Sequence, residues 1–450
     1  MRAQTERLRV LLGFSATPTA AQRSMVSLLG ATALGQAIAL AVSPVLTRLT
    51  GPAAFGVFGV YLAALGVLGA VASWRFGLAV PLPETDEEAA AVVFAGALGA
   101  LALAAFAGLL VLFAGDWVAR VVLDTPPIEP LLWLIPAGML GVGLTDVLSG
   151  WCLRHRDFRP LVRSRITRSV GTSALQLAGG VVVRGSPIGL VGGDVLGRLF
   201  SVWEMARTIT HAERGRALVP SISKIRAAVS RYRAFALVST PSTLINAAGA
   251  WAPVVLLTVW WGPIAGGLYT LGQRVIGVPI GLLGDSAGQV YIGELAARAR
   301  DSSSAMTVLF SKTAKGLLTL GIPAGIAMLL LGPLAFRIVF GPQWADAGVM
   351  VRWLALALVC QLVAIPLAQT LNVLGYQRQQ LAWDVTRLTL TVAGFALAHY
   401  MALSAVESIA VYGVITAVTY LLLIALSWRA IRERAAEGNT KMTIVVGTPP

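Results

Sequence analysis

Runs of about 20 mostly apolar residues recur along the whole chain, and short polar or basic segments separate them. A helix of about this length crosses the hydrocarbon core of a bilayer, and only a helix satisfies its own backbone hydrogen bonds there. The pattern therefore predicts an all-α integral membrane protein with about twelve transmembrane helices. The predicted spans are 25–46, 54–73, 89–114, 131–152, 167–184, 188–208, 234–260, 265–290, 314–339, 348–371, 382–403 and 407–428.

The composition excludes a separate water-soluble domain. Of the 450 residues, 56% are hydrophobic and only 12% are charged, and the mean hydropathy is +0.77. Soluble domains carry about 25% charged residues. A net charge of +14 is typical of proteins that bind nucleic acid. Here the basic residues lie in short segments between apolar runs, so membrane lipids are the expected partner and nucleic acid is not.

Most of the 35 Lys and Arg residues fall on one side of the predicted membrane. Positive charge stays in the cytoplasm, so the tails at 1–24 and 429–450 and the basic linker at 211–233 are predicted to be cytoplasmic. This assignment places Arg163, Arg165 and Arg168 with the cytoplasmic residues that follow the fourth span. Residues 222–233 of the linker are either an amphipathic helix on the anionic inner leaflet or a solvated determinant of topology.

One turn pattern occurs in both halves of the chain. GPAAFG at 51–56 joins the first two spans, and GPIAGG at 262–267 joins the seventh and eighth. Gly-Pro is good turn chemistry in general, but the equivalent positions favour two similar lobes at 25–210 and 234–428. In transporters with internal repeats, the substrate path lies at the repeat interface. A third such turn, GPQWADAG, occupies 341–348.

Four segments resemble, in order, a family of polysaccharide transporters, the Wzx-type flippases. They are LTRLTGPAAFGVFGVYLA (46–63), RFGLAVPLPETDEEA (75–89), the stretch from STPSTLINAAGAW to GDSAGQV (239–290) and FGPQWADAG (340–348). The family is part of the multidrug/oligosaccharidyl-lipid/polysaccharide exporter superfamily. Only the ordered series is specific. Asp285 departs from the family pattern, where a small residue is expected.

The resemblance implies two six-helix bundles around a central cavity in the bacterial inner (cytoplasmic) membrane. It implies transfer of undecaprenyl-pyrophosphate-linked oligosaccharide from the inner to the outer leaflet by alternating access, without ATP hydrolysis. Such a flippase serves O-antigen, capsule or exopolysaccharide synthesis, and its expected partners are the polysaccharide polymerase and glycosyltransferases of the same pathway. No cofactor is implied.

Two arginines lie near the middle of predicted spans, where a charge costs about 2.5–3.5 kcal/mol on insertion scales. We expect Arg198 and Arg274 to line the cavity and bind the pyrophosphate or acidic sugars of the cargo, because the guanidinium fork binds phosphate at two points. For Arg198 an alternative is open, since Asp194 lies four residues earlier on the same helix face. No acidic residue lies at helical spacing from Arg274 within its span.

Four further residues are candidates for weaker reasons. Arg48 and Arg75, at opposite ends of the first two spans, either guide the headgroup or anchor the helices at the interface. Asp146 and Asp194 are candidates for an ion or proton site, because a titrating carboxylate couples transport to the membrane potential. Each acid is also able to serve simply as the partner of a base.

An enzyme is the less favoured class. A membrane polymerase or glycosyltransferase needs acid and base groups at the lipid headgroup, and the longest outer loop, at 115–130, carries acids but no His. We therefore assign no catalytic residue. The three His residues are scattered, so no metal site is expected. A multidrug exporter of the same superfamily is the alternative transporter, although such a protein is expected to have an acidic, aromatic cavity for cations.

Overall fold

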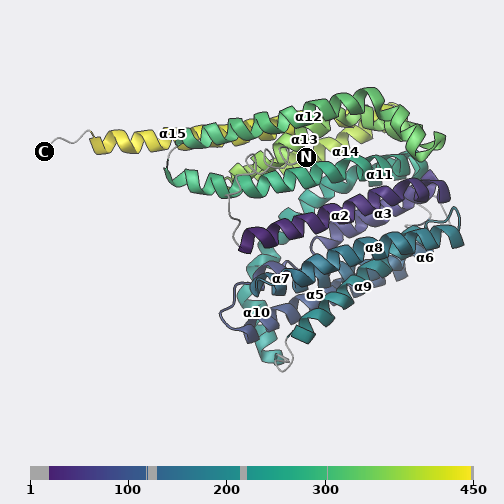
Figure 1. Ribbon diagram of the computed structural model, residues 1–450, viewed down its shortest axis with the longest axis horizontal. Helices are drawn as coiled ribbons and strands as arrows, with labels where there is room; N and C mark the ends of the chain where they lie inside the picture. Colours follow the sequence, from purple (N-terminus) through teal and green to yellow (C-terminus); the bar gives the residue numbers. More distant parts are fainter. Residues whose placement is uncertain (1–19, 118, 120–128, 213–219, 302, 447–450) are drawn as a thin grey trace. The chain divides into compact units, whose positions relative to one another are not determined.

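The computed structural model describes residues 20–117, 119, 129–212, 220–301 and 303–446 (Figure 1). All regular structure in these ranges is helical, which confirms the predicted all-α fold. The elements are α2 (Ala20–Leu49), α3 (Pro52–Gly69), α4 (Phe76–Ala79), α5 (Asp86–Trp117), α6 (Glu129–Leu132), α7 (Leu134–Arg154), α8 (Arg159–Val182), α9 (Ile188–Ala212), α10 (Ile222–Ala234), η3 (Phe235–Ser239), α11 (Thr240–Asp301), α12 (Ser303–Phe340), η4 (Pro342–Trp344), α13 (Ala345–Val373), α14 (Gln377–Tyr400) and α15 (Ala405–Val446).

Each predicted span is helical over most of its length, and the second extends past the end of α3 at Gly69. Among the described residues, nine helical segments are long and apolar enough to cross a membrane. One of them, Phe235–Gly277, contains the predicted boundary between two spans. Gly262 breaks the helix there with φ 85° and ψ 168°, a conformation that a residue with a Cβ rarely adopts. The predicted spans at 167–184 and 188–208 lie on α8 and α9, which are not among those nine segments.

The start of α8 differs from the sequence prediction. The helix begins at Arg159, eight residues before the predicted span. Its first three turns therefore contain three of the predicted cytoplasmic bases, Arg163, Arg165 and Arg168. Helix α8 continues outward from the loop without a break because Pro160 occupies its first turn, where proline is favoured.

The described chain divides into two compact units. The N-terminal unit contains Ser24–Leu271 together with Phe336–Trp344. The C-terminal unit contains Gly272–Ala335 and the described residues from Ala345 onward. The predicted lobes at 25–210 and 234–428 stay a prediction, because contacts within one conformation do not test which segments move together. The predicted tail at 1–24 falls mostly outside the described residues.

Glycines allow α8 and α9 to approach each other at backbone distance. On α9, Gly189, Gly193 and Gly197 recur every four residues and so share one helix face. A methyl group added at Gly193 would lie 2.7 Å from the Gln176 nitrogen of α8, and one at Gly197 would lie 2.7 Å from the Thr172 nitrogen. Small residues spaced in this way are how membrane helices pack closely.

The two equivalent Gly-Pro turns contact each other reciprocally within the N-terminal unit. A Cβ added at Gly56 would collide with the Pro263 carbonyl, and a Cβ added at Gly267 would collide with the Pro52 carbonyl. Gly56 corresponds to Gly267 in the aligned motifs, and Pro52 corresponds to Pro263. The glycine of each motif therefore contacts the proline of the other, as expected around a two-fold axis. The third turn adds Trp344, fully buried, whose ring lies 5.1 Å from that of Phe55.

The predicted amphipathic helix of the linker is present as α10. Its Lys224 and Arg231 pair with Glu87 and Glu88 in the first turn of α5. Its apolar side, centred on Ala228, packs into the core cluster that contains Phe76 and Trp151. Whether the opposite side contacts the inner leaflet stays a prediction.

The close approach of α8 and α9 is testable with two adjacent glycines. Gly193→Ala is expected to lower stability by about 1–3 kcal/mol, because the new methyl group meets the α8 backbone. Gly192→Ala is the matched control, since a Cβ there meets nothing within 4 Å. It is expected to be neutral or to stabilise the helix by about 0.5–1 kcal/mol. Thermal unfolding of the purified protein in detergent measures both, and equal midpoints for the two variants would contradict the packing described.

Candidate functional site

An ion cluster centred on Asp194 joins three helices of the N-terminal unit. Arg198, one turn later on α9, donates to Asp194 Oδ2 from Nη2 at 2.8 Å and from Nε at 3.2 Å. The hydroxyl of Tyr61, on α3, donates to the same oxygen at 2.9 Å. Arg168 Nη2, on α8, lies 3.9 Å from Oδ1. The cluster therefore contains one carboxylate and two guanidinium groups.

Burial differs sharply between the two arginines. Arg198 is 7% exposed and Asp194 is 5% exposed, whereas the side chain of Arg168 is 41% exposed. A buried carboxylate needs a close partner, because desolvation of each ion costs several kcal/mol. Arg198 supplies that partner. Arg168, at a longer distance, is the positive charge that reaches the surface of the unit.

The positions of these groups follow from helix geometry. Asp194 and Arg198 each directly follow a glycine of the α8-facing row, so they point to the neighbouring side of α9. The aliphatic part of Arg198 packs against Gly141 of α7, where an added Cβ would lie 3.1 Å from Cγ. A small residue at this place on α7 therefore gives the arginine room inside the helix bundle.

Asp146 lies in a second polar cluster, at a break in the second span. Helix α3 ends at Gly69 and the chain resumes as the short α4 at Phe76. Asp146 Oδ2 accepts a hydrogen bond from Ser73 Oγ within this break. The carboxylate also lies so close to Gly77 that a Cβ there would collide with it. Asp146 is thus a half-buried acid against irregular backbone.

The backbone of the same break is strained. Trp74 and Arg75 adopt left-handed conformations, with φ of 52° and 62°, each of which costs of order 1–3 kcal/mol for a residue with a Cβ. Arg75 Nε is buried and has no hydrogen-bond partner among the described residues. Such strain concentrates at binding and switch regions.

The remaining predicted residues are placed separately. Arg48 is exposed at the end of α2, and its Nη2 lies 3.5 Å from the Val339 carbonyl. Arg274 is half-buried and Asp285 is exposed, and both lie on α11 in the C-terminal unit. The structure thus brings Asp194 and Arg198 together, as helical spacing predicted. Among the described residues, no group of three or more His, Cys, Asp or Glu side chains is arranged to hold a metal ion.

Two members of the Asp194 cluster were missed from the sequence. Arg168 was predicted as a cytoplasmic base and not as a partner of Asp194, and Tyr61 lies more than a hundred residues away from Asp194. The signal for Arg168 was available: Pro160 marks a helix start, and from there Arg168 is more than two turns inside the helix. No sequence signal indicated Tyr61.

Helices long and apolar enough to cross a bilayer, repeated along the described chain, indicate a multi-pass integral membrane protein, and comparisons with known proteins agree. Residues 45–349 match the family model described as polysaccharide biosynthesis protein. The chain therefore belongs to the polysaccharide biosynthesis protein family, as the resemblance of its segments indicated. No curated protein matches the sequence.

Solved structures of the MOP superfamily share the fold. The lipid II flippase MurJ in an inward closed conformation superposes with a TM-score of 0.69 at 10% identity, over 94% of each chain. An inward-facing multidrug resistance MATE transporter gives 0.63 at 15% identity, over 90% of this chain and 95% of that one. A MOP transporter from Pyrococcus furiosus, described as having a binding pocket of reverse polarity, gives 0.62 at 15% identity, over 91% and 96%. These similarities establish the fold.

The energetic role of the Asp194 pair is testable by a double-mutant cycle. Asp194→Asn is expected to cost about 3–5 kcal/mol, because it leaves the buried Arg198 without its charge partner. Adding Arg198→Met in the same chain is expected to restore most of that loss. Glu433→Gln is the matched control: Glu433 pairs with Arg429 at the same spacing, but at an exposed position, so the cost there is at most about 0.5 kcal/mol. Thermal unfolding in detergent is the measurement, and equal shifts at the two pairs would show that burial is irrelevant.

Proposed function

We propose that this protein is a flippase that moves an undecaprenyl-pyrophosphate-linked oligosaccharide from the inner to the outer leaflet by alternating access. The observation that carries the proposal is the Asp194 cluster, which has one more positive than negative group and presents Arg168 at a surface of the unit. Family membership supports a role in polysaccharide biosynthesis. The fold shared with a lipid II flippase and with drug transporters supports transport as the activity.

The sign of the charge favours an anionic cargo. A phosphate group accepts hydrogen bonds in two places from one guanidinium fork. Arg168 is suited to this, because its contact with Asp194 is long enough to leave its remaining donors for a ligand. Arg198 contributes by holding the carboxylate in place. Its direct contact with cargo, as proposed from the sequence, remains part of the proposal, together with cargo binding by Arg274.

The other arginines fit the ends of the path. Within the described chain, Arg75 has a donor without a partner, at the strained break that follows α3. Arg48 lies at the opposite end of the first two spans. We propose that they receive and release the pyrophosphate headgroup at the two membrane surfaces.

A multidrug exporter is the second candidate, supported by the fold shared with MATE proteins. Such a transporter needs acids that are free to pair with a cationic drug. In the N-terminal unit Asp194 is already paired with Arg198, and Asp146 accepts from Ser73. A polymerase or glycosyltransferase is less supported still, since the solved relatives are transporters.

The proposed setting is the bacterial inner membrane with both termini in the cytoplasm. There the polymerase and glycosyltransferases of one pathway would deliver and consume the lipid-linked sugar, for O-antigen, capsule or exopolysaccharide. The protein's own residues bind and move the cargo, and no bond of the substrate breaks.

Transport of a lipid-linked sugar by the purified protein tests the proposal. Proteoliposomes are loaded with a fluorescent polyprenyl-diphosphate saccharide, and delivery to the opposite leaflet is followed by quenching. Arg168→Gln and Arg274→Gln are each expected to slow delivery about tenfold, the value of one lost charge-assisted hydrogen bond of 1.5–3 kcal/mol. Lys312→Gln, at an exposed site, is the control and is expected to retain the wild-type rate. Absence of transport by the wild type, with intact liposomes, would contradict the flippase assignment.

Coupling to an ion is a separate prediction. If Asp146 titrates or binds a cation during the cycle, Asp146→Asn abolishes the response of transport to pH, Na⁺ or membrane potential while leaving passive exchange of cargo. One charge crossing the membrane gains about 2.3 kcal/mol per 100 mV. The transport rate of the wild type is therefore expected to depend steeply on membrane potential. Asp285→Asn is the control, because Asp285 is exposed on α11. A wild-type transport rate that does not change with pH, Na⁺ or membrane potential would rule out ion coupling.

A further inference from the structure

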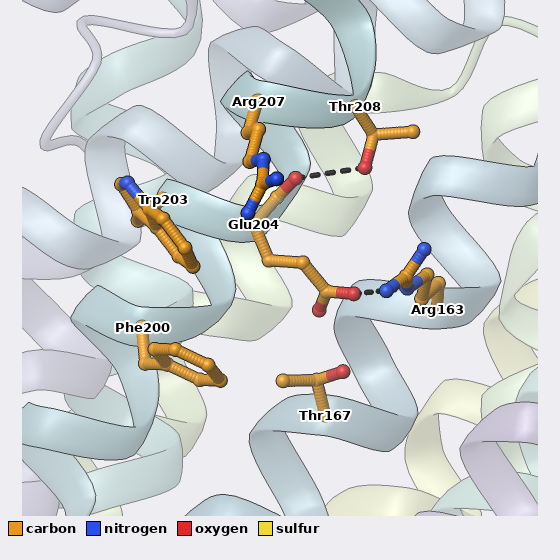
Figure 2. Close-up of a pocket in the computed structure, with 7 residues that line it drawn as sticks. All are labelled: Arg163, Thr167, Phe200, Trp203, Glu204, Arg207 and Thr208. Atoms are coloured by element: carbon orange, nitrogen blue, oxygen red, sulfur yellow. Dashed lines mark hydrogen bonds and ion pairs between the residues drawn. The ribbon is translucent and has the colours of Figure 1, made fainter. Parts of the chain in front are cut away.

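A groove between α8 and α9 has a volume of about 570 Å³. Its lining residues include none of the members of the Asp194 cluster. It is lined by Arg163, Thr167, Phe200, Trp203, Glu204, Arg207 and Thr208 (Figure 2). Its walls come from the first turns of α8 and the last turns of α9, which are antiparallel neighbours. By the predicted topology this is the cytoplasmic end of the hairpin, where cargo assembled inside the cell arrives.

A buried carboxylate points into the groove with one oxygen unused. Glu204 is only 8% exposed, and Figure 2 shows its side chain extending from α9 toward α8. Its Oε1 pairs with Arg163, but Oε2 is buried and has no hydrogen-bond partner within the described chain. A buried acceptor on a charged group is costly to leave unsatisfied, so this oxygen indicates a ligand that donates hydrogen bonds.

Two aromatic rings form the neighbouring wall. Phe200 and Trp203 are stacked, with centroids 5.4 Å apart and an interplanar angle of 28°. They are 51% and 53% exposed, so part of each ring is accessible in the groove although the two rings cover each other on one side. Flat apolar faces beside hydrogen-bonding groups suit a ligand with an apolar face and a polar edge, as a pyranose ring has in its C–H face and its hydroxyls.

The cations of the groove argue against a phosphate as the group bound there. Arg163 is already paired with Glu204, and Arg207 lies over the Trp203 ring at 5.5 Å. The two threonine hydroxyls add neutral hydrogen-bonding groups, and Thr208 Oγ1 already donates to the Glu204 carbonyl at 2.8 Å, which leaves its oxygen as an acceptor. The groove carries one more base than acid, but Arg163 is held in an ion pair and Arg207 lies over an aromatic ring. The acceptors that remain are Glu204 Oε2 and the threonine oxygens.

We propose that this groove binds the saccharide part of the lipid-linked cargo. Sugar hydroxyls donate to Glu204 Oε2 and to the threonine oxygens, and the C–H face of one sugar ring stacks on Trp203 or Phe200. The inference rests on the proposed flippase function and adds to it a recognition site for sugar, distinct from the Arg168 and Asp194 groups proposed for the pyrophosphate.

Equilibrium binding to the purified full-length protein in detergent tests the site. The probes are farnesyl diphosphate linked to glucose, galactose or N-acetylglucosamine, and farnesyl diphosphate without sugar. The wild type is expected to bind at least one sugar probe more tightly than the sugar-free one. Glu204→Gln is expected to weaken that probe about tenfold, and Trp203→Leu about fivefold. Neither variant is expected to change the affinity for farnesyl diphosphate.

Two matched controls exist in the C-terminal unit. Trp353→Leu removes a tryptophan with the same 53% exposure, and Glu294→Gln removes a half-buried acid that is paired with Arg298. Both are expected to bind all probes as the wild type does. Thermal unfolding of each variant checks that the fold is intact, and Glu204→Gln, which preserves side-chain shape, decides the case if Trp203→Leu unfolds.

Three results would overturn the sugar site. The first is equal affinity of the wild type for all the probes. The second is a loss of affinity for sugar-free farnesyl diphosphate in the groove variants that equals their loss for the sugar probes. That result would make the groove a site for phosphate or the lipid chain. The third is displacement of the sugar probes by phosphatidylethanolamine, whose ammonium group would then be the donor to Glu204. The flippase proposal fails separately, by absent transport, so a chain that transports without binding sugar in the groove would refute only this inference.

Discussion

Close backbone contact between α8 and α9 determines where the charged groups of the N-terminal unit lie. In a bilayer the lipid is as apolar as leucine, so helices associate through close packing and internal hydrogen bonds. The glycine row at 189, 193 and 197 provides that packing. Because successive residues of a helix are rotated by about 100°, Asp194 and Arg198 must then point to the next face, toward α3 and α7. The position of the ion pair is thus a consequence of the glycine seam.

The same seam explains how a polar hairpin is accommodated among apolar helices. Helix α8 carries bases at Arg163 and Arg168, and α9 carries acids at Glu204 and Asp194. Because the helices are antiparallel, Arg163 near the start of α8 meets Glu204 in the second half of α9. One turn further along α8, Arg168 meets Asp194, which lies earlier on α9. Two cross-helix pairs therefore replace hydration that the bilayer interior does not offer. These charged residues are part of the reason that α8 and α9 are not among the described segments apolar enough to cross a membrane.

Local rules predicted the features that local forces determine. Spans followed from apolar length, turns from Gly-Pro, and the Asp194–Arg198 pair from a spacing of four residues. Tyr61 was not predictable, because its hydroxyl reaches Asp194 only after α3 packs against α9. A loop at Arg75 was predicted, but its left-handed backbone was not, because Trp and Arg are not residue types that favour a positive φ. The unused oxygen of Glu204 likewise depends on the helix pairing.

The reciprocal contact of the two Gly-Pro turns is what an internal repeat predicts. Gly56 against Pro263 and Gly267 against Pro52 is a relation that two copies of one motif make around an approximate two-fold axis. Each glycine lacks the Cβ that would collide with the opposing carbonyl, so this residue type lets both turns approach at backbone distance. Phe55 of the first motif packs against the fully buried Trp344 of the third turn, so interlocking rings hold the junction on that side. The sequence repeat and the packing of the turns therefore support each other.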